Sequence, residues 1–218
     1  MTDAADLVVW RHGRTEWNET GRFQGQLDPP LDPVGHGQAR AAAAALAQLP
    51  PGAIISSDLD RAATTASYLA ELTGLAVVPD PRLREIDVGA WGGLTRPAVE
   101  ARYPDTFHAW LRGEDVHREG GESLSEVATR ARAAVDQHLA ALPRPLVVVT
   151  HGGTARALVL SLLGLPVTAS QAFAAMGNAR WAALEERRGA WRLTAYNVGR
   201  ERDASEPGRD DATPEPVL

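Results

Sequence analysis

Short apolar runs alternate with helical segments along most of the chain. Strand-like runs cover 6–10, 53–57, 75–79 and 146–150, and helical segments cover 35–49, 58–73, 123–142 and 153–163. Strands that alternate with helices form a mostly parallel sheet whose two faces are both covered by helices. We therefore expect a single α/β domain over residues 1–200, followed by a disordered acidic tail over 201–218.

Local signals place several element boundaries. Ser123 followed by Glu126 is a capping-box pattern for the helix that begins there. Asp58 is a candidate N-cap for the helix that follows the second strand-like run. The segments 181–186 and 191–196 flank a short turn and indicate a β-hairpin.

Two residue types are absent from the 218 residues. There is no Cys, which excludes a thiol nucleophile, a thiolate zinc site, an iron–sulfur centre and a disulfide framework. All 22 residues counted as Lys+Arg are Arg, which excludes Schiff-base chemistry, pyridoxal-phosphate attachment and the P-loop lysine. Any reaction must therefore use His, carboxylates, hydroxyls or a metal.

Charge and hydropathy point to no macromolecular partner. The formal net charge of −6 does not indicate nucleic-acid binding, because much of it lies after residue 200. No apolar run is long enough to cross a bilayer, and no basic, apolar segment opens the sequence. We expect a cytoplasmic protein with neither a nucleic-acid nor a membrane partner.

Two of the six His residues share an unusual context. His12 follows Leu-Val-Val-Trp-Arg and precedes Gly13, and His151 follows Leu-Val-Val-Val-Thr and precedes Gly152. Ligands of open parallel sheets bind outside the carboxyl ends of the strands, and Gly lets the backbone approach a ligand closely. The alternative is two unrelated surface His residues beside strand-ending turns. The matching contexts favour a shared site.

Two Arg residues indicate that this site binds an anion. Arg61 lies in the first turn of a helix, where the helix dipole disfavours a cation but attracts phosphate. Arg11 directly follows a strand and precedes His12, and its planar guanidinium suits bidentate contact with phosphate. The competing interpretation of Arg61 is an ion pair with Asp58 or Asp60.

Asn18 and Glu85 complete the candidate set. Asn18 can donate an amide hydrogen to an oxyanion, or simply form a turn. Glu85 stands near several Arg residues and would ordinarily pair with one of them. Beside a bound phosphate, like-charge repulsion would instead favour its protonated form near neutrality, which makes it a candidate proton donor.

These residues belong to an ordered set of short motifs. The set is Arg11-His12-Gly13 with Thr15 and Asn18, Ser56-Ser57-Asp58-Leu59 with Arg61-Ala62 and Thr65-Ala66, Leu83 with Glu85 and Gly89, Gly120-Gly121-Glu122-Ser123, and His151-Gly152-Gly153. In this order the motifs resemble the histidine phosphatase superfamily, which includes the phosphoglycerate mutases. Three further segments resemble an actinobacterial subfamily that dephosphorylates a glucosylated phosphoglycerate: Gln24-Gly25-Gln26-Leu27-Asp28, Leu163 to Val167, and Met176-Gly177-Asn178-Ala179.

The resemblance implies a phosphoglycerate mutase-like fold and a role for each matching residue. His12 would attack phosphorus and become a phosphohistidine. Glu85 would protonate the leaving alkoxide and then take a proton from the hydrolytic water. Arg11, Arg61 and His151 would hold the phosphoryl group as it is transferred. The resemblance also implies a small phosphorylated metabolite as substrate, no metal or other cofactor, and a homodimer as an expected assembly.

Substrate binding is expected to involve three more matching residues, Asn18, Gln24 and Gly152. The sequence departs from the family pattern at Arg14, where the family often has Glu or Gln, and at Gly92, where Glu is frequent. Both positions would affect the mouth of the pocket, and neither is assigned a catalytic role.

Two sets of residues are candidates for recognising the rest of the substrate. Three additional Arg residues are candidates for a second anionic group: Arg14, Arg22 and Arg84. Three Trp residues would either stack on a sugar or belong to the core: Trp91, Trp110 and Trp181.

Four alternatives remain open at this stage. A broad-specificity phosphatase would carry the same motifs, whereas a mutase would need a longer basic lid than the short, mixed segment 112–119. Asp58-Leu59-Asp60 mimics the Asp-x-Asp of magnesium-dependent aspartate phosphatases, but that chemistry usually requires a Lys. A non-catalytic phosphate-binding module would not need Glu85.

Overall fold

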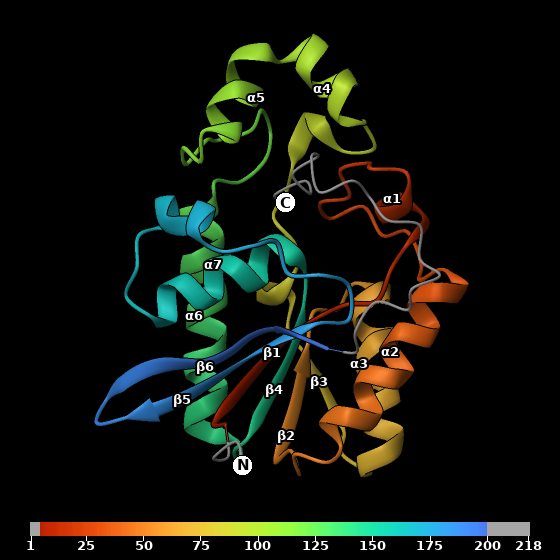
Figure 1. Cartoon of the computed structure of the whole chain (residues 1–218), viewed down its shortest axis with the longest axis vertical. Coiled ribbons are helices and arrows are strands. Elements are labelled where there is room, and N and C mark those ends of the chain that lie inside the picture. Colours follow the sequence, from red (N-terminus) through yellow and green to blue (C-terminus); the bar gives the residue numbers. More distant parts are fainter. Residues whose placement is uncertain (1–4, 200–218) are drawn as a thin grey trace.

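A six-stranded sheet forms the centre of the computed structural model, which describes residues 5–199 (Figure 1). The strands are β1 (Leu7–Arg11), β2 (Ala53–Ser56), β3 (Val77–Pro79), β4 (Leu146–Thr150), β5 (Trp181–Arg187) and β6 (Ala190–Val198). Their order is β3-β2-β4-β1-β5-β6, with β1 to β4 parallel and the β5–β6 hairpin antiparallel. The expected mostly parallel α/β fold, with its C-terminal hairpin, is confirmed.

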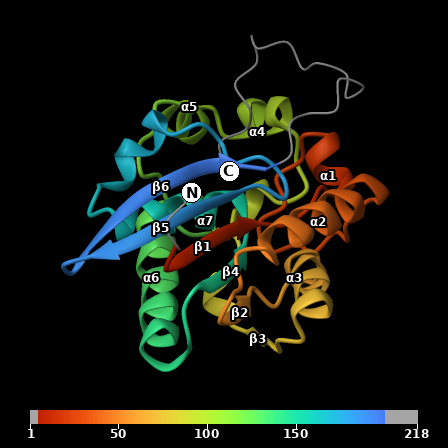
Figure 2. The same cartoon turned by 60° about the horizontal axis from the view of Figure 1, so that its bottom comes forward.

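Helices cover both faces of this sheet. Helices α2 (Pro33–Leu46) and α3 (Asp60–Thr73) lie on one face, and α6 (Leu124–Ala141) and α7 (Gly152–Leu162) lie on the other (Figure 2). Alternate side chains of β1 pack on opposite faces of the sheet, because successive strand residues point in opposite directions. Val8 and Trp10 pack in the core beneath α2 and α3, whereas Leu7 and Val9 pack in the core beneath α6 and α7. Burial on both faces explains the uninterrupted apolar runs of the sequence.

A smaller layer lies beyond the carboxyl ends of the parallel strands. It contains the short helix α1 (Glu16–Glu19) and helices α4 (Arg96–Arg102) and α5 (Pro104–Leu111) (Figure 1). Three 3₁₀ helices, η1 (Pro81–Leu83), η2 (Gly89–Trp91) and η3 (Val167–Ala172), lie in the connections. An aromatic cluster that includes Phe23, Trp91, Phe107 and Trp110 fills the space beneath α4 and α5. Trp91, Trp110 and Trp181 are all buried, so they belong to the core.

The helix boundaries confirm one cap and correct another. Ser123 and Glu126 form the expected capping box of α6. The prediction that Asp58 caps the next helix is wrong, because α3 begins at Asp60 and its N-cap, Leu59, makes no side-chain capping bond. The Asp58 carboxylate instead accepts two hydrogen bonds from Arg84, at 2.7 and 2.6 Å.

The loop between β1 and α2 contains one unexpected element. Helix α1 has a capping box of its own, in which Thr15 accepts from the backbone of Asn18 and the Asn18 side chain accepts from the backbone of Thr15. The tail expected over 201–218 lies outside the described residues. Within residues 5–199, none of the helices combines the length and hydrophobicity that a bilayer span requires.

Candidate active site

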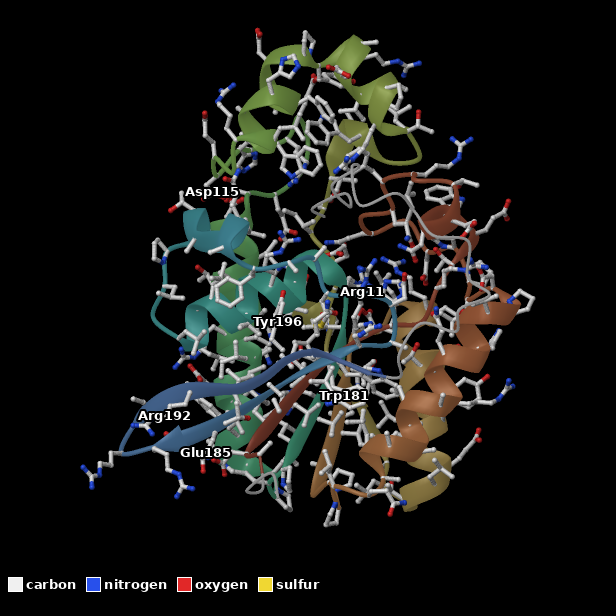
Figure 3. All side chains as sticks on the ribbon, in the orientation of Figure 1. Arg11, Asp115, Trp181, Glu185, Arg192 and Tyr196 are labelled. Atoms are coloured by element: carbon white, nitrogen blue, oxygen red, sulfur yellow. The ribbon has the colours of Figure 1, made fainter. Side chains whose placement is uncertain are left out.

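Two parallel strands bring His12 and His151 to the same edge of the sheet. β1 and β4 are direct neighbours, and Arg11 at the end of β1 is in register with Thr150 at the end of β4. The next residue on each strand is a His, and the two imidazole rings lie 5.1 Å apart between centroids. Figure 3 shows Arg11 at this edge, beneath the layer that contains α4 and α5. The matching sequence contexts therefore correspond to one location.

The hydrogen bond of His12 indicates which ring nitrogen carries its proton. Its Nδ1 lies 2.6 Å from the carbonyl oxygen of Gly13, which can only accept, so Nδ1 is the protonated nitrogen. Burial lowers the pKa of His12 well below 6.5, and the positive charges of Arg61 and Arg11 lower it further. His12 is therefore a neutral imidazole with its lone pair on Nε2.

His151 is held in a similar electrostatic environment. Its ring is completely buried at the N-cap of α7, and its Nε2 lies 2.8 Å from Oγ of Ser57. Burial lowers the pKa of His151 well below 6.5, with further contributions from Arg61, His12 and Arg11. Its Nδ1 has no hydrogen-bond partner among residues 5–199. His151 is thus a second neutral imidazole beside the first.

Arg61 is a fully buried cation in the first turn of α3. Its Nη1 donates to the carbonyl of Leu27 at 2.7 Å and to Asp28 at 3.2 Å, and its Nη2 donates to the carbonyl of Gly25 at 2.7 Å. Its ion-pair partner is therefore Asp28 and not an acid of its own helix. Burial lowers the pKa of Arg61 below its usual value. The contacts fix the loop that contains Gln24 against the start of α3.

Arg11 is buried between the end of β1 and the start of α7. Its Nη1 donates to the carbonyl oxygen of Met176. A Cβ atom on Gly152 would lie 3.3 Å from two atoms of the Arg11 guanidinium, so the absence of a side chain allows this close approach. The structure thus gives Gly152 a packing role beside Arg11, in addition to the expected contact with substrate.

Glu85 lies at the N-terminus of α7, on the same side of the sheet as the two imidazoles. Its carboxylate accepts from the backbone N–H groups of Ile86 at 2.9 Å, Gly153 at 3.1 Å and Thr154 at 3.0 Å. Oγ1 of Thr154 lies 3.1 Å from the carboxylate and 2.8 Å from the carbonyl oxygen of Arg84, and its single proton serves one of them at a time. The first N–H groups of a helix have no partner within the helix, so Glu85 satisfies two of them in α7.

The Arg residues near Glu85 in sequence do not pair with its carboxylate. Arg84 pairs with Asp58, and Arg82 pairs with Asp80, in both cases at 2.6 Å. The ordinary interpretation of Glu85 as the partner of an adjacent Arg therefore does not hold. The interpretation of Arg84 as a site for a second anion is weakened for the same reason.

Arg14 and Arg22, the other two candidates for a second anionic group, are also engaged. Arg14 forms ion pairs with Glu19 and Asp32, and Arg22 donates to the carbonyl of Gly93 at 2.8 Å. These contacts weaken both residues as candidates for the second anionic group.

Asn18 and Gln24 differ in how their amides are satisfied. The Asn18 oxygen accepts from Thr15 and from Nδ2 of Asn178, which fixes the orientation of its amide. Gln24 is buried, and neither polar atom of its amide has a hydrogen-bond partner among residues 5–199. Buried polar groups are normally paired, so the Gln24 amide is an indication of a ligand-binding position.

The structure adds two residues that sequence reasoning did not assign. Nδ2 of Asn178 donates to the carbonyls of His12 and Gly13, each at 3.3 Å, and thereby holds the loop of the candidate nucleophile. Its motif contributed to the resemblance, but no pattern indicated a function. Thr154, which contacts Glu85, gave no signal beyond its position after Gly-Gly.

Arg118 is a buried cation in the segment that connects α5 to α6. Its guanidinium lies 5.1 Å from the ring centre of Trp91, and its Nε has no hydrogen-bond partner within the described part of the chain. Burial lowers the pKa of Arg118 to about 10, although the negative charges of Glu85 and Asp115 oppose this change. The mixed composition of segment 112–119 gave no indication of this burial.

The site contains no obvious metal-binding group. Over residues 5–199, no group of three or more His, Asp or Glu residues has a geometry suited to a metal ion. The positive charges at the site include Arg11 and Arg61, which act on His12, and Arg118, which interacts electrostatically with Glu85.

Comparison with known proteins defines the class to which this fold and site belong. The model of the histidine phosphatase superfamily (branch 1) matches residues 7–199. The chain belongs to the histidine phosphatase superfamily, and its enzyme class is phosphoric monoester hydrolase.

Individual relatives narrow the comparison. The chain is 44% identical over 190 residues to glucosyl-3-phosphoglycerate phosphatase of Mycobacterium tuberculosis, covering 83% of this chain and 85% of the relative. A solved structure of a mycobacterial glucosyl-3-phosphoglycerate phosphatase with VO3 is 44% identical, with a TM-score of 0.85 and coverage of 90% and 100%. Phosphoserine phosphatase 1 of Hydrogenobacter thermophilus is 36% identical over 188 residues, covering 84% of this chain and 88% of the relative.

Proposed function

We propose that this protein is a metal-independent phosphomonoesterase that acts through a phosphohistidine at His12. The observation that carries the proposal is a neutral imidazole with its lone pair on Nε2, beside the cations Arg11 and Arg61 and the second imidazole of His151. A neutral imidazole is a competent nucleophile at physiological pH. The cations supply the charge neutralisation on which phosphoryl transfer depends.

The first step transfers the phosphoryl group to the protein. Nε2 of His12 forms a bond to phosphorus as the ester P–O bond breaks, and Glu85 gives its proton to the departing alkoxide oxygen. Arg11, Arg61 and Nδ1 of His151 hold the phosphoryl oxygens, while the fixed amide of Asn18 and the amide of Gln24 assist.

The second step releases phosphate and restores the starting state. A water molecule attacks phosphorus and gives a proton to the Glu85 carboxylate, as the N–P bond breaks and the lone pair returns to Nε2 of His12. The hydrogen-bond donors around Glu85 suit this step because they stabilise the carboxylate. The products are inorganic phosphate and an alcohol, and no metal is needed to balance either step.

The substrate that we propose is glucosyl-3-phosphoglycerate or a closely related small phosphorylated metabolite. The names of the mycobacterial relatives support this choice. The Hydrogenobacter relative is named as a phosphoserine phosphatase, so similar chains are named for different substrates. Both substrates implied by these names carry a carboxylate. Arg118 is the buried cation that we assign to this second anionic group, because its Nε lacks a hydrogen-bond partner in the described chain.

A substrate panel tests this assignment. We expect kcat/KM to be higher for glucosyl-3-phosphoglycerate than for glycerol 3-phosphate or 4-nitrophenyl phosphate, assayed at concentrations below KM. Replacing Arg118 by Met should reduce this preference by about 10-fold or more, as expected for a charge-assisted hydrogen bond. Equal kcat/KM across the panel would reject the specific substrate and leave a broad-specificity phosphatase.

Two alternative activities have less support. The Asp58 carboxylate is bound by both Nε and Nη2 of Arg84, so it is poorly placed to serve as the nucleophile of a magnesium-dependent phosphatase. Segment 112–119 is short, and Asp115 within it binds the backbone N–H groups of Leu124 and Ser125 in α6. A short, anchored segment favours access of water and thus hydrolysis over mutase activity. A homodimer and a cytoplasmic location stay predictions.

A further inference from the structure

The backbone around Glu85 lies outside regular secondary structure. Residues 84–88 connect η1 to η2, so no helix or strand hydrogen bonds fix the position of Glu85. A group that transfers protons must nevertheless be held within hydrogen-bond reach of the reacting atoms. The contacts that hold this segment are therefore candidates for a role in the reaction.

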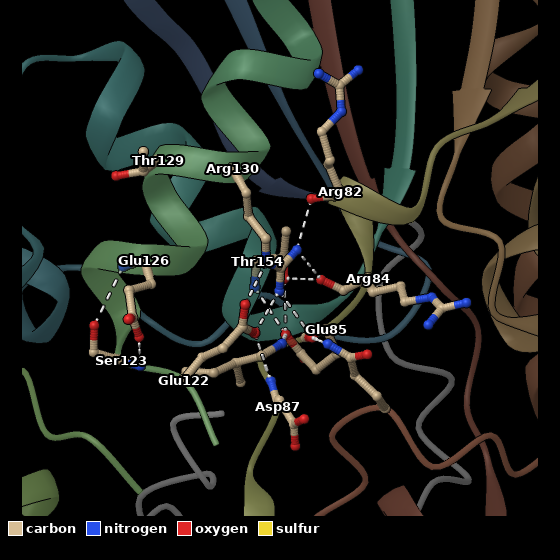
Figure 4. Close-up of polar contacts among 12 residues, drawn as sticks. Arg82, Arg84, Glu85, Asp87, Glu122, Ser123, Glu126, Thr129, Arg130 and Thr154 are labelled. Atoms are coloured by element: carbon tan, nitrogen blue, oxygen red, sulfur yellow. Dashed lines mark hydrogen bonds and ion pairs between the residues drawn. The ribbon is translucent and has the colours of Figure 1, made fainter. Parts of the chain in front are cut away.

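Arg130 of α6 binds two carbonyl groups of this segment and one of η1, directly before it. Its Nη1 donates to the carbonyl oxygens of Arg82 at 2.7 Å and Arg84 at 2.8 Å, and its Nη2 donates to that of Glu85 at 3.0 Å (Figure 4). A single planar guanidinium thus fixes the backbone on the N-terminal side of Glu85 and at Glu85 itself.

Glu122 orients Arg130 and extends the contact to the other side of Glu85. Nε and Nη2 of Arg130 donate to the two carboxylate oxygens of Glu122, at 2.8 and 2.9 Å. The same carboxylate accepts from the backbone N–H of Asp87 at 2.8 Å. The Arg130–Glu122 pair is only slightly exposed, and charge-assisted bonds of this kind are strong and directional.

The opposite side of the segment is attached to β4 and α7. Oγ1 of Thr150 donates to the carbonyl of Leu83 at 2.7 Å, and Oγ1 of Thr154 lies 2.8 Å from that of Arg84. Glu85 thus lies between α6 on one side and the start of α7 on the other. Its carboxylate meets α7, whereas its backbone is bound by Arg130.

We infer that Arg130 and Glu122 are positioning residues for the proton transfers of Glu85. This inference rests on the proposed function, in which Glu85 is the general acid and base. The pair acts by fixing the backbone from 82 to 87, so that the carboxylate remains at the N-terminus of α7 beside the phosphoryl site. Without it, the segment gains freedom, and the proton donor is displaced from the leaving oxygen.

The test uses leaving groups that differ in their need for a proton. An alkyl phosphate such as glycerol 3-phosphate expels an alkoxide and requires the acid, whereas 4-nitrophenyl phosphate expels a stable phenolate. For Arg130→Met we expect kcat/KM to fall by about 10- to 100-fold on the alkyl ester, as misplacement of a catalytic group predicts. On the aryl ester we expect a change of less than about threefold, because general acid catalysis contributes little there.

Arg132→Met is the matched control on the same helix. Arg132 pairs with Asp136 and donates to the carbonyl of Ser161, far from the segment of Glu85 in the contact network. Its kcat/KM on both esters should equal that of the unmodified protein. Inhibition by inorganic phosphate should be unchanged in both Arg variants, because neither substitution removes a residue of the phosphate site.

A double-mutant cycle separates this role from a general loss of structure. In a Glu85→Gln background, the further change Arg130→Met should alter kcat/KM on the alkyl ester by less than about threefold, because coupled residues show non-additive effects. Arg130 also contributes to the low pKa of His151, so an action through His151 would instead persist in that background. Full additivity would overturn the inference.

The remaining outcomes are also decisive. If Arg130→Met fails to fold, Arg130→Lys replaces it in the test, because Lys keeps the charge but lacks the planar guanidinium. Arg130→Lys should also lose more kcat/KM on the alkyl ester than on the aryl ester, with a smaller difference between the two. Equal losses on both esters for a folded Arg130 variant would overturn the inference and leave the proposed function intact. If Glu85→Gln itself lacks leaving-group selectivity, the proposed role of Glu85 fails, and the inference fails with it.

Discussion

Two neutral imidazoles beside buried guanidinium groups define the chemistry of this site. Each ring loses contact with water on folding, and the nearby charges of Arg61 and Arg11 act in the same direction, so the pKa values of His12 and His151 both fall. Because protonating these rings in the folded state is unfavourable, each ring stays neutral and keeps a free lone pair over a wide pH range. The proposed nucleophile, His12, therefore needs no separate base.

The lowered pKa values predict how stability depends on pH. Below pH 6.5 the unfolded chain protonates His12 and His151, whereas the folded protein does not, so the free energy of unfolding falls as the pH decreases. The slope should approach about 1.4 kcal/mol per pH unit for each ring. Denaturant unfolding between pH 7.5 and 5 measures it. His12→Asn and His151→Asn should each reduce the slope, and a flat profile for the unmodified protein would show that the rings are protonated when folded.

The motifs singled out the main candidate site residues, but they did not indicate how those residues are held. His12, His151, Arg61 and Glu85 could be named from strand ends, helix starts and motif order. Their partners could not be named from the sequence. Thr154 reaches Glu85, and Asp28 reaches Arg61, only through tertiary folding. The Gln24 amide was expected at the site from the resemblance alone.

Among the elements, the turn that follows β1 approaches the first turn of α2 so closely that a side chain at Gly13 has no room. A Cβ atom on Gly13 would lie 2.4 Å from the carbonyl oxygen of Gly35 in the first turn of α2. Such a distance is far below van der Waals contact and would force the backbone to shift. Gly13 in the first motif thus has a structural reason besides proximity to substrate.

Gly13→Ala should therefore lower the free energy of unfolding by about 1–3 kcal/mol, as overpacking of a tight contact does. Gly37→Ala is the matched control, because it lies within the same helix α2 and its added Cβ would meet nothing within 4 Å. That control should instead gain about 0.5–1 kcal/mol from helix propensity. Thermal unfolding of the two variants compares them directly. Equal effects would show that the contact with Gly35 does not constrain the fold.

Element boundaries were predictable where a local signal dominates. The capping box of Ser123 and Glu126 could be predicted, because both of its hydrogen bonds lie within four residues. The Asp58 cap was wrong because a bidentate partner from another segment, Arg84, competes for the carboxylate and is outside the reach of local rules. Helix α1 was missed because four residues are too few to produce a periodic pattern.

Over the whole molecule, the sheet follows from the sequence because burial on both faces leaves uninterrupted apolar runs that local inspection detects. The layer of α4 and α5 was harder to predict, since its aromatic core combines Phe23 with Trp91, Phe107 and Trp110 from a distant part of the sequence. The strand register that aligns Arg11 with Thr150 is likewise a tertiary property, yet it is what brings the two imidazoles together. The chemistry thus depends on the parallel pairing of β1 and β4.

Identification of the phosphorylated residue tests the central proposal most directly. The protein is mixed with a ³²P-labelled phosphomonoester in the presence of EDTA, quenched within milliseconds in base, and digested for peptide mapping, since phosphohistidine survives base but not acid. The account predicts label on Nε2 of His12, undiminished by EDTA, and no label in His12→Ala. Label on Asp58, or steady turnover with no covalent phosphoprotein, would contradict it.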